Sequence, residues 1–192
     1  AALPDPAERF RGRGHGLRLL VIGGSLGARV LNRTVPEAVA RLHGELPMKV
    51  HHQTGAAEEP EVRERYAMLG DAARVEAFVD DMAAAYAWAD LVVCRAGALT
   101  IAELAAAGLP SILVPYPHAT DDHQTGNAAY LASAGAAVLM PQPEFNATSL
   151  ADELQRMGGD RDGLLAMANR ARELALTDAA RQVARLCLEE AA

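Results

Sequence analysis

The apolar run at 91–94, Leu-Val-Val-Cys, stops at a turn of small residues and leads straight into an alanine-rich helical segment. A strand that continues through such a turn into a helix directs the unpaired N–H groups of the helix at the space above the strand. We expect Glu103 in the first turn of this helix. A carboxylate there either complements the helix dipole or accepts hydrogen bonds from neighbouring hydroxyls, such as the diol of a ribose.

The same alternation of strand and helix continues along the chain. Strands are predicted at 17–22, 48–53, 74–78, 91–94, 111–115 and 137–140. Helices are predicted after each glycine turn and at 58–69, 81–88, 149–157, 161–176 and 178–190, and a cap at 34–37 is expected to restart the first helix as far as Leu42. This order predicts an α/β fold with a Rossmann-like parallel sheet of about six strands, right-handed crossovers and helices on both faces.

The predicted sheet places two polar loops at one edge. The segment that begins at Arg95 follows one strand, and the loop 116–124 follows the next strand along the chain. Open α/β sheets bind ligands in the crevice at the carboxyl ends of their strands. We therefore expect both loops to contribute side chains to a single ligand site.

Composition indicates one domain and excludes several classes of protein. Residues 1–16 are rich in Pro, Gly and Arg and are predicted to be a linker, with one domain over 17–192. The chain begins without methionine, so we expect it to be a piece of a longer protein. A net charge of −7 without a basic stripe argues against a nucleic-acid partner. Cys94 and Cys187 form no metal pattern and are predicted to be reduced core residues of a cytoplasmic protein.

The first glycine turn, Gly-Gly-Ser-Leu-Gly at 23–27, does not match known phosphate motifs. Its glycines are wrongly spaced for G-x-G-x-x-G, and the second strand ends at 51–54 without the acid that a nicotinamide ribose needs, which argues against an oxidoreductase. No P-loop pattern occurs either. Gly24 and Ser25 still allow a backbone and a hydroxyl to approach a phosphate, although tight-turn packing explains the same residues.

The remaining polar groups divide into structural and ligand-facing candidates. His51 and His52 alternate across a strand, and we interpret both as structural. The adjacent acids at 80–81 and 121–122 are predicted to be helix caps, and no metal site is expected. His118 and His123 lie in the loop that follows the fifth strand and are candidates for ligand contact.

Several of these motifs occur together in one known family. The turn at 23–29, the segment 78–82, the run 95–100 with Glu103, the turn 107–110 and the polar positions from Pro115 to Ala137 resemble, in the same order, the MurG family of N-acetylglucosaminyltransferases. The resemblance covers about residue 3 to the end of the chain and corresponds only to the C-terminal, donor-binding half of that family.

This resemblance implies a function and a set of site residues. It implies an inverting hexosyltransferase of the GT-B type that uses no cofactor and moves N-acetylglucosamine from UDP-N-acetylglucosamine to lipid I, making lipid II in peptidoglycan synthesis. Glu103 would bind the ribose, Val79 the uracil edge, and Ser25 with the amides of Ala98, Leu99 and Thr100 the diphosphate. Gln124 and Asn127 would bind the sugar, with Gly24 and His123 as further candidates; His123 stands where relatives often carry another glutamine.

The resemblance also implies what this chain lacks. The general base, the lipid I site and the membrane contact would belong to an absent N-terminal half, so no catalytic residue is assigned here and the isolated chain is expected to be inactive. The whole enzyme would be peripheral, on the cytoplasmic side of the bacterial inner membrane. Two alternatives stay open: a stand-alone donor subunit of a two-chain transferase, and an isomerase similar to UDP-N-acetylglucosamine 2-epimerase.

Overall fold

A computed structural model describes residues 3–24, 26–176 and 187 of the chain. Its strands form one sheet in the order β3-β2-β1-β4-β5-β6, with every neighbouring pair parallel. The strands are β1 (Leu17–Ile22), β2 (Met48–Gln53), β3 (Ala73–Glu76), β4 (Leu91–Cys94), β5 (Ser111–Leu113) and β6 (Ala137–Leu139). The predicted Rossmann-like sheet is confirmed, and β1, β2 and β4 have the predicted bounds.

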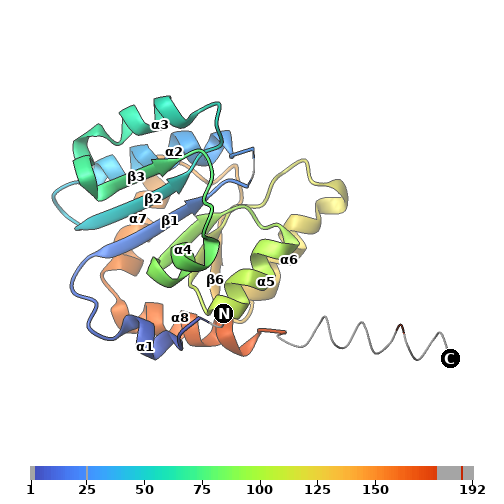
Figure 1. Ribbon diagram of the computed structural model, residues 1–192. Helices are drawn as coiled ribbons and strands as arrows, with labels where there is room; N and C mark the ends of the chain where they lie inside the picture. The colour runs from blue at the N-terminus through green and yellow to red at the C-terminus, as the bar shows by residue number, and fades with distance from the viewer. Residues whose placement is uncertain (1–2, 25, 177–186, 188–192) are drawn as a thin grey trace.

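Helices cover both faces of this sheet (Figure 1). They are α1 (Pro6–Phe10), α2 (Arg29–Arg41), α3 (Glu59–Arg65), α4 (Met82–Trp88), α5 (Ala98–Ala107), α6 (His123–Ala132), α7 (Ala147–Gly158) and α8 (Arg161–Glu173), with short 3₁₀ turns at Ala67–Ala72 and Thr120–Asp122. One apolar core lies between the sheet and α2, α3 and α7, and a second lies between the sheet and α4, α5 and α6.

The central strand β1 supplies both cores because successive side chains of a strand point to opposite faces. Leu19 and Val21 join the core under α2, whereas Leu20 and Ile22 join the core under α4 and α5. All four side chains are buried, so β1 is apolar on both faces, as parallel sheets require.

The segment predicted as a linker contains a helix that packs on the opposite end of the molecule from the crevice. Figure 1 shows α1 beside α8. The Arg9 guanidinium donates to the carbonyl of Ala107 at 2.7 Å and to that of Gly108, at the end of α5. Residues 6–10 are thus bound to this domain. That the segment joins a further domain stays a prediction.

Two helix predictions were wrong in detail. The first helix does not restart at a cap, because α2 runs unbroken through Pro36. Pro36 lacks the N–H that an interior helix position donates, but it is buried, together with Leu31, Asn32, Val35, Ala38 and Val39 of the same helix. The helix predicted at 58–69 ends at Arg65, where a 3₁₀ turn with a glycine of positive φ, Gly70, takes over.

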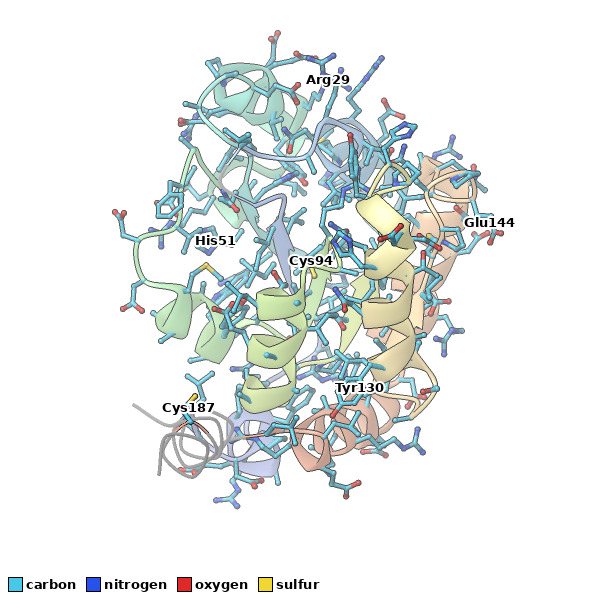
Figure 2. The ribbon with its side chains drawn as sticks, turned by 90° about the vertical axis from the view of Figure 1, so that its right-hand side faces the viewer. Arg29, His51, Cys94, Tyr130, Glu144 and Cys187 are labelled. Carbon is cyan, nitrogen blue, oxygen red and sulfur yellow. The ribbon has the colours of Figure 1, made fainter. Side chains whose placement is uncertain are left out.

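Three further expectations need correction or lie outside the described residues. Asp81 caps α4, since its side chain accepts from the N–H of Ala84, and Asp80 does not take that role. Cys94 is buried at the centre of the molecule, but Cys187 is exposed and so is not a core residue (Figure 2). Of the helix predicted at 178–190, only Cys187 lies within the described residues.

Candidate functional site

The crevice lies where the winding of the sheet reverses, between β1 and β4. Ile22 and Cys94 are paired at the carboxyl ends of these strands, so the loops that follow them lie side by side. This edge opens into a crevice of about 900 Å³. Its walls come from the β1–α2 loop, from the starts of α2, α5 and α6, and from the loops after β4, β5 and β6. The lining residues are Ile22, Gly23, Gly24, Gly27, Ala28, Arg29, Val30, Arg33, Thr34, Glu37, Arg95, Gly97, Thr100, Tyr116, Gln124 and Gln142.

The glycine loop is shaped by close backbone contacts. A Cβ on Gly27 would lie 1.8 Å from the carbonyl oxygen of Thr54, and Gly27 has a φ of +73°. Gln53 donates through Nε2 to the carbonyl of Gly24 at 2.7 Å. Gly24 itself is exposed, with open space where a Cβ would be, so its backbone faces the crevice. Ser25 lies outside the described residues.

Helix α5 begins at the crevice without a side-chain cap. Gly97 is its N-cap residue and has no side chain to accept from the first turn. Among the described residues, the N–H groups of Ala98, Leu99 and Thr100 have no hydrogen-bond acceptor. Helix α2 begins at the same crevice after Ala28, again without a side-chain cap. Two positive helix ends therefore converge on one space, which is suited to an anion.

Two side chains of α6 clamp the turn that leads into α5. Gln124 accepts through Oε1 from the N–H of Ala96 at 3.2 Å and from that of Tyr116 at 3.0 Å. Asn127 donates through Nδ2 to the carbonyl of Ala96 at 3.0 Å. Gln124 thus does not cap its own helix. Its Nε2 donors and the Oδ1 acceptor of Asn127 keep no partner among the described residues.

Glu103 lies one turn further along α5 than predicted. The helix starts at Ala98, and its first turn holds no acid. Since the helix dipole acts within the first turn, dipole complementation does not explain Glu103. The side chain is exposed, and its Oε2 accepts from the hydroxyl of the buried Tyr86 at 2.8 Å. Burial, and next the bond to Glu103, raises the pKa of Tyr86, so its hydroxyl stays a donor.

Val79 lies in the bend before α4, on the side of the sheet that carries Glu103. Its side chain is buried in the core under α4 and α5. Neither its N–H nor its C=O has a hydrogen-bond partner within the described residues. A free donor next to a free acceptor suits the edge of a heterocyclic base.

Arg95 is a crevice residue to which the sequence motif assigned no role. Its guanidinium donates to the carbonyl of Pro115 at 3.0 Å and to Oε1 of Gln142 at 2.7 Å, and it lies 5.4 Å from the ring centroid of Tyr116. Burial lowers the pKa of Arg95 from its usual value. A strand that ends directly in an arginine was the signal available in the sequence.

The strand histidines serve the fold rather than the crevice. His52 is completely buried and bonds Tyr66 at 3.0 Å and Asn32 at 3.1 Å. Burial, and next the neighbouring His51, lowers the pKa of His52 to about 3. His51 points to the opposite face of the sheet and pairs with Glu76 at 2.6 Å. Neither histidine lines the crevice.

The loop before α6 has an unusual backbone. Asp121 and Asp122 both have positive φ, at 52° and 51°. Asp122 occupies the N-cap position of α6, yet its carboxylate accepts from the Thr125 hydroxyl at 2.7 Å and, in the described part of the chain, from no backbone N–H. His118 and His123 are both exposed in this region, and the ring of His118 lies edge-on to Tyr116.

Within residues 3–24, 26–176 and 187, no group of three or more His, Cys, Asp or Glu side chains is arranged to hold a metal ion. In that same part of the chain, every helix is too short or too polar to cross a membrane.

The chain matches one protein family along most of its length. Residues 18–183 match the glycosyltransferase family 28 C-terminal domain. A Methylococcus capsulatus protein named UDP-N-acetylglucosamine–N-acetylmuramyl-(pentapeptide) pyrophosphoryl-undecaprenol N-acetylglucosamine transferase is 58% identical over 176 residues, which are 92% of this chain and 49% of that protein. A crystal structure of Acinetobacter baumannii MurG has a TM-score of 0.89 at 36% identity and covers 97% of this chain and 53% of that chain. The chain spans about half the length of these relatives.

The fold is shared more widely. A Listeria monocytogenes structure described as a UDP-N-acetylglucosamine 2-epimerase has a TM-score of 0.63 at 19% identity, over 92% of this chain and 45% of that chain. At that identity the likeness concerns the fold alone.

Proposed function

The chain belongs to the glycosyltransferase family 28 C-terminal domains, and on that premise we propose that it is the donor-binding half of an N-acetylglucosaminyltransferase. In this proposal the whole enzyme transfers N-acetylglucosamine from UDP-N-acetylglucosamine to lipid I and makes lipid II. The observation that carries the proposal is the convergence of two uncapped helix N-termini on one crevice at the switch point of the sheet.

The diphosphate of the donor would lie at these helix ends. The free N–H groups of Ala98, Leu99 and Thr100 offer several donors within a single turn, and Gly24 opens its backbone from the other side. Backbone donors combined with helix dipoles favour a doubly charged group. Ser25 stays a predicted contact.

The nucleoside would lie on the α4 side of the diphosphate. Glu103 has a free Oε1. Among the described residues, the one hydrogen bond to this carboxylate comes from Tyr86 and is accepted by Oε2. An exposed carboxylate oxygen in that position supports a bond to the ribose hydroxyls. The unpaired N–H and C=O of Val79 support the predicted contact with the uracil edge.

The sugar would lie at the α6 side of the diphosphate. Gln124 is on the crevice wall, and its remaining hydrogen-bonding capacity is the pair of Nε2 donors. Asn127 keeps an Oδ1 acceptor one turn further along α6. A donor beside an acceptor matches vicinal hydroxyls, which supports both predicted contacts. His123 stays a further candidate.

The proposed chemistry uses the same backbone groups. As the bond between the anomeric carbon and the diphosphate breaks, negative charge grows on the leaving oxygen, and preorganised N–H donors lower the energy of that charge. The acceptor hydroxyl must also lose a proton to a base. Among the described residues that line the crevice, the one carboxylate is Glu37. It forms an ion pair with Arg65 at 3.4 Å, which makes it a poor base. We therefore propose that the base belongs to the other half of the enzyme.

Exposed apolar side chains at the rim support the idea that another surface closes the crevice. Leu26 is 94% exposed and Leu99 is 81% exposed, each beside one of the two helix ends. We propose that the N-terminal half, with the lipid I site and the contact to the cytoplasmic face of the membrane, covers them.

A titration of the 192-residue chain tests this proposal. By calorimetry, the chain is expected to bind UDP and UDP-N-acetylglucosamine weakly and to transfer no sugar to lipid I. The variant Glu103→Ala is expected to lose about 1.5–3 kcal/mol of UDP binding, the range for a hydrogen bond to a charged group. Its unfolding free energy should also fall, by about 1 kcal/mol, because the Tyr86 hydroxyl loses its acceptor.

The matched control is Glu64→Ala, which removes an exposed carboxylate on α3. This variant should bind UDP like the parent chain. Absence of UDP binding by the parent chain would overturn the donor site, and efficient transfer by the chain alone would overturn its description as half of an enzyme.

A further inference from the structure

Tyr86 carries a hydroxyl group at a place where the fold needs only an aromatic ring. Its side chain is 5% exposed and belongs to the apolar core under α4 and α5, together with Val79 and Cys94. A phenylalanine would fill the same space. The hydroxyl reaches out of this core and donates to Oε2 of Glu103 at 2.8 Å, its one partner among the described residues.

The two ends of this bond differ in mobility. Tyr86 is held by the core, whereas Glu103 is an exposed side chain with several rotatable bonds. Immobilising such a side chain on binding costs free energy, and a protein that orders it beforehand avoids that cost.

We propose that Tyr86 is a positioning residue for nucleotide binding: its hydroxyl holds Glu103 so that the free Oε1 faces the ribose diol of the donor. The inference rests on the proposed function, because it assumes that Glu103 binds the ribose. Tyr86 and Val79 belong to the same apolar core, so the predicted ribose contact and the predicted base contact are both anchored in it.

The protonation state of Tyr86 is consistent with this role. Burial raises the pKa of Tyr86 well above the usual value of a tyrosine, so the phenol is protonated and can donate at neutral pH. A carboxylate accepts but does not donate, so the pair has one fixed polarity. The bond therefore orders Glu103 without competing with a ligand hydroxyl for Oε1.

The test compares two nucleotides in four proteins. UDP and 2′,3′-dideoxy-UDP, which lacks the diol, are titrated into the parent chain, Tyr86→Phe, Glu103→Ala and the double variant. We expect Tyr86→Phe to weaken UDP binding about three- to tenfold, the equivalent of ordering one flexible side chain. Binding of the dideoxy nucleotide should stay unchanged. In the Glu103→Ala background, Tyr86→Phe should have no further effect on UDP.

Tyr130→Phe is the matched control. Its hydroxyl also makes one hydrogen bond, to the carbonyl of Leu174 at 2.9 Å, but it lies near α8, far from Arg29 on the crevice wall (Figure 2). This variant should bind both nucleotides like the parent chain.

Each result separates the inference from the proposed function. If Tyr86→Phe weakened both nucleotides equally, the hydroxyl would serve the fold and the inference would fail. If Glu103→Ala lowered UDP affinity and Tyr86→Phe did not, the inference would fail while the proposed function stood. If the parent chain bound neither nucleotide, the proposed function itself would be overturned.

Discussion

Replacements of Gln124 can distinguish a contact with the sugar from a purely structural role in holding the loops of the crevice. Its Oε1 accepts from the N–H groups of Ala96 and Tyr116, on the loops after β4 and β5. Its Nε2 carries the donors that remain for a sugar. We therefore compare Gln124→Ala, which removes both functions, with Gln124→Glu, which keeps two acceptor oxygens and loses the donors.

The expected effects on stability follow from the two backbone bonds. In Gln124→Ala both N–H groups lose their acceptor, and at about 0.5–1.5 kcal/mol for each bond the free energy of unfolding should fall by about 1–3 kcal/mol. In Gln124→Glu a carboxylate accepts from the same N–H groups, and a charged acceptor makes the stronger bond. The unfolding free energy of that variant should match that of the parent or exceed it.

The expected effects on binding are expressed as a ratio of affinities. The alanine variant disturbs Ala96, which leads into the predicted diphosphate helix, and the glutamate variant adds a charge near it, so both should weaken UDP itself. In Gln124→Ala the ratio of UDP-N-acetylglucosamine affinity to UDP affinity cancels the disturbance of the helix start, and losing the Nε2 donors should lower this ratio about three- to tenfold, the value of one neutral hydrogen bond. In Gln124→Glu the added charge repels UDP more strongly than the less charged UDP-sugar, so for that variant the two UDP-sugars, which carry equal charge, are compared with each other.

Calorimetric titration with UDP, UDP-N-acetylglucosamine and UDP-N-acetylgalactosamine measures these ratios, and urea denaturation measures the stabilities. The preference for the glucose over the galactose configuration should narrow in both variants, because an unpaired polar group penalises the wrong epimer. An unchanged ratio of UDP-N-acetylglucosamine to UDP affinity in Gln124→Ala, together with an unchanged epimer preference in both variants, would refute the sugar contact and leave Gln124 with the loop alone.

Three further outcomes concern the scaffold. Gly27→Ala should cost about 2 kcal/mol or more of unfolding free energy in urea, because its Cβ would meet the Thr54 carbonyl at a positive φ. Because the pKa of His52 is lowered to about 3 in the folded protein, the unfolded chain binds the extra proton first, and stability should fall by about 1.4 kcal/mol per pH unit from about pH 6 downward. His52→Gln should reduce that slope, and replacement of the exposed His43 should not. Asp90 is buried at the end of the loop before β4, and its carboxylate forms ion pairs with Arg13 and Arg161. Asp90→Ala should therefore cost about 3–5 kcal/mol of unfolding free energy in urea, because both guanidinium groups lose their buried partner.

Much of the fold could be predicted because its signals are local. The run at Leu91–Cys94 is apolar throughout, and the run at Leu17–Ile22 is apolar apart from Arg18, which is typical of strands buried on both faces. Each run is followed by a turn that contains glycine. The free N–H groups at the start of α5 were predicted for the same reason, since any helix leaves its first turn unpaired when no residue caps it. The path of α2 through Pro36 was not predicted, because proline locally disfavours the interior of a helix and only the packed structure shows that the helix continues there.

The candidate site shows the same contrast between what local sequence predicts and what packing decides. Sequence alone identified Glu103 and Gln124 as polar groups beside a predicted anion site, since each stands near a helix start that follows a strand. It did not assign their hydrogen bonds, because Tyr86 and Ala96 lie on other elements and meet these side chains only when α4, α5 and α6 pack on one sheet. The residue types and the order of strands and helices in the sequence thus determine which groups can bind a ligand. The packing of these helices on one sheet decides which of their atoms remain free to do so.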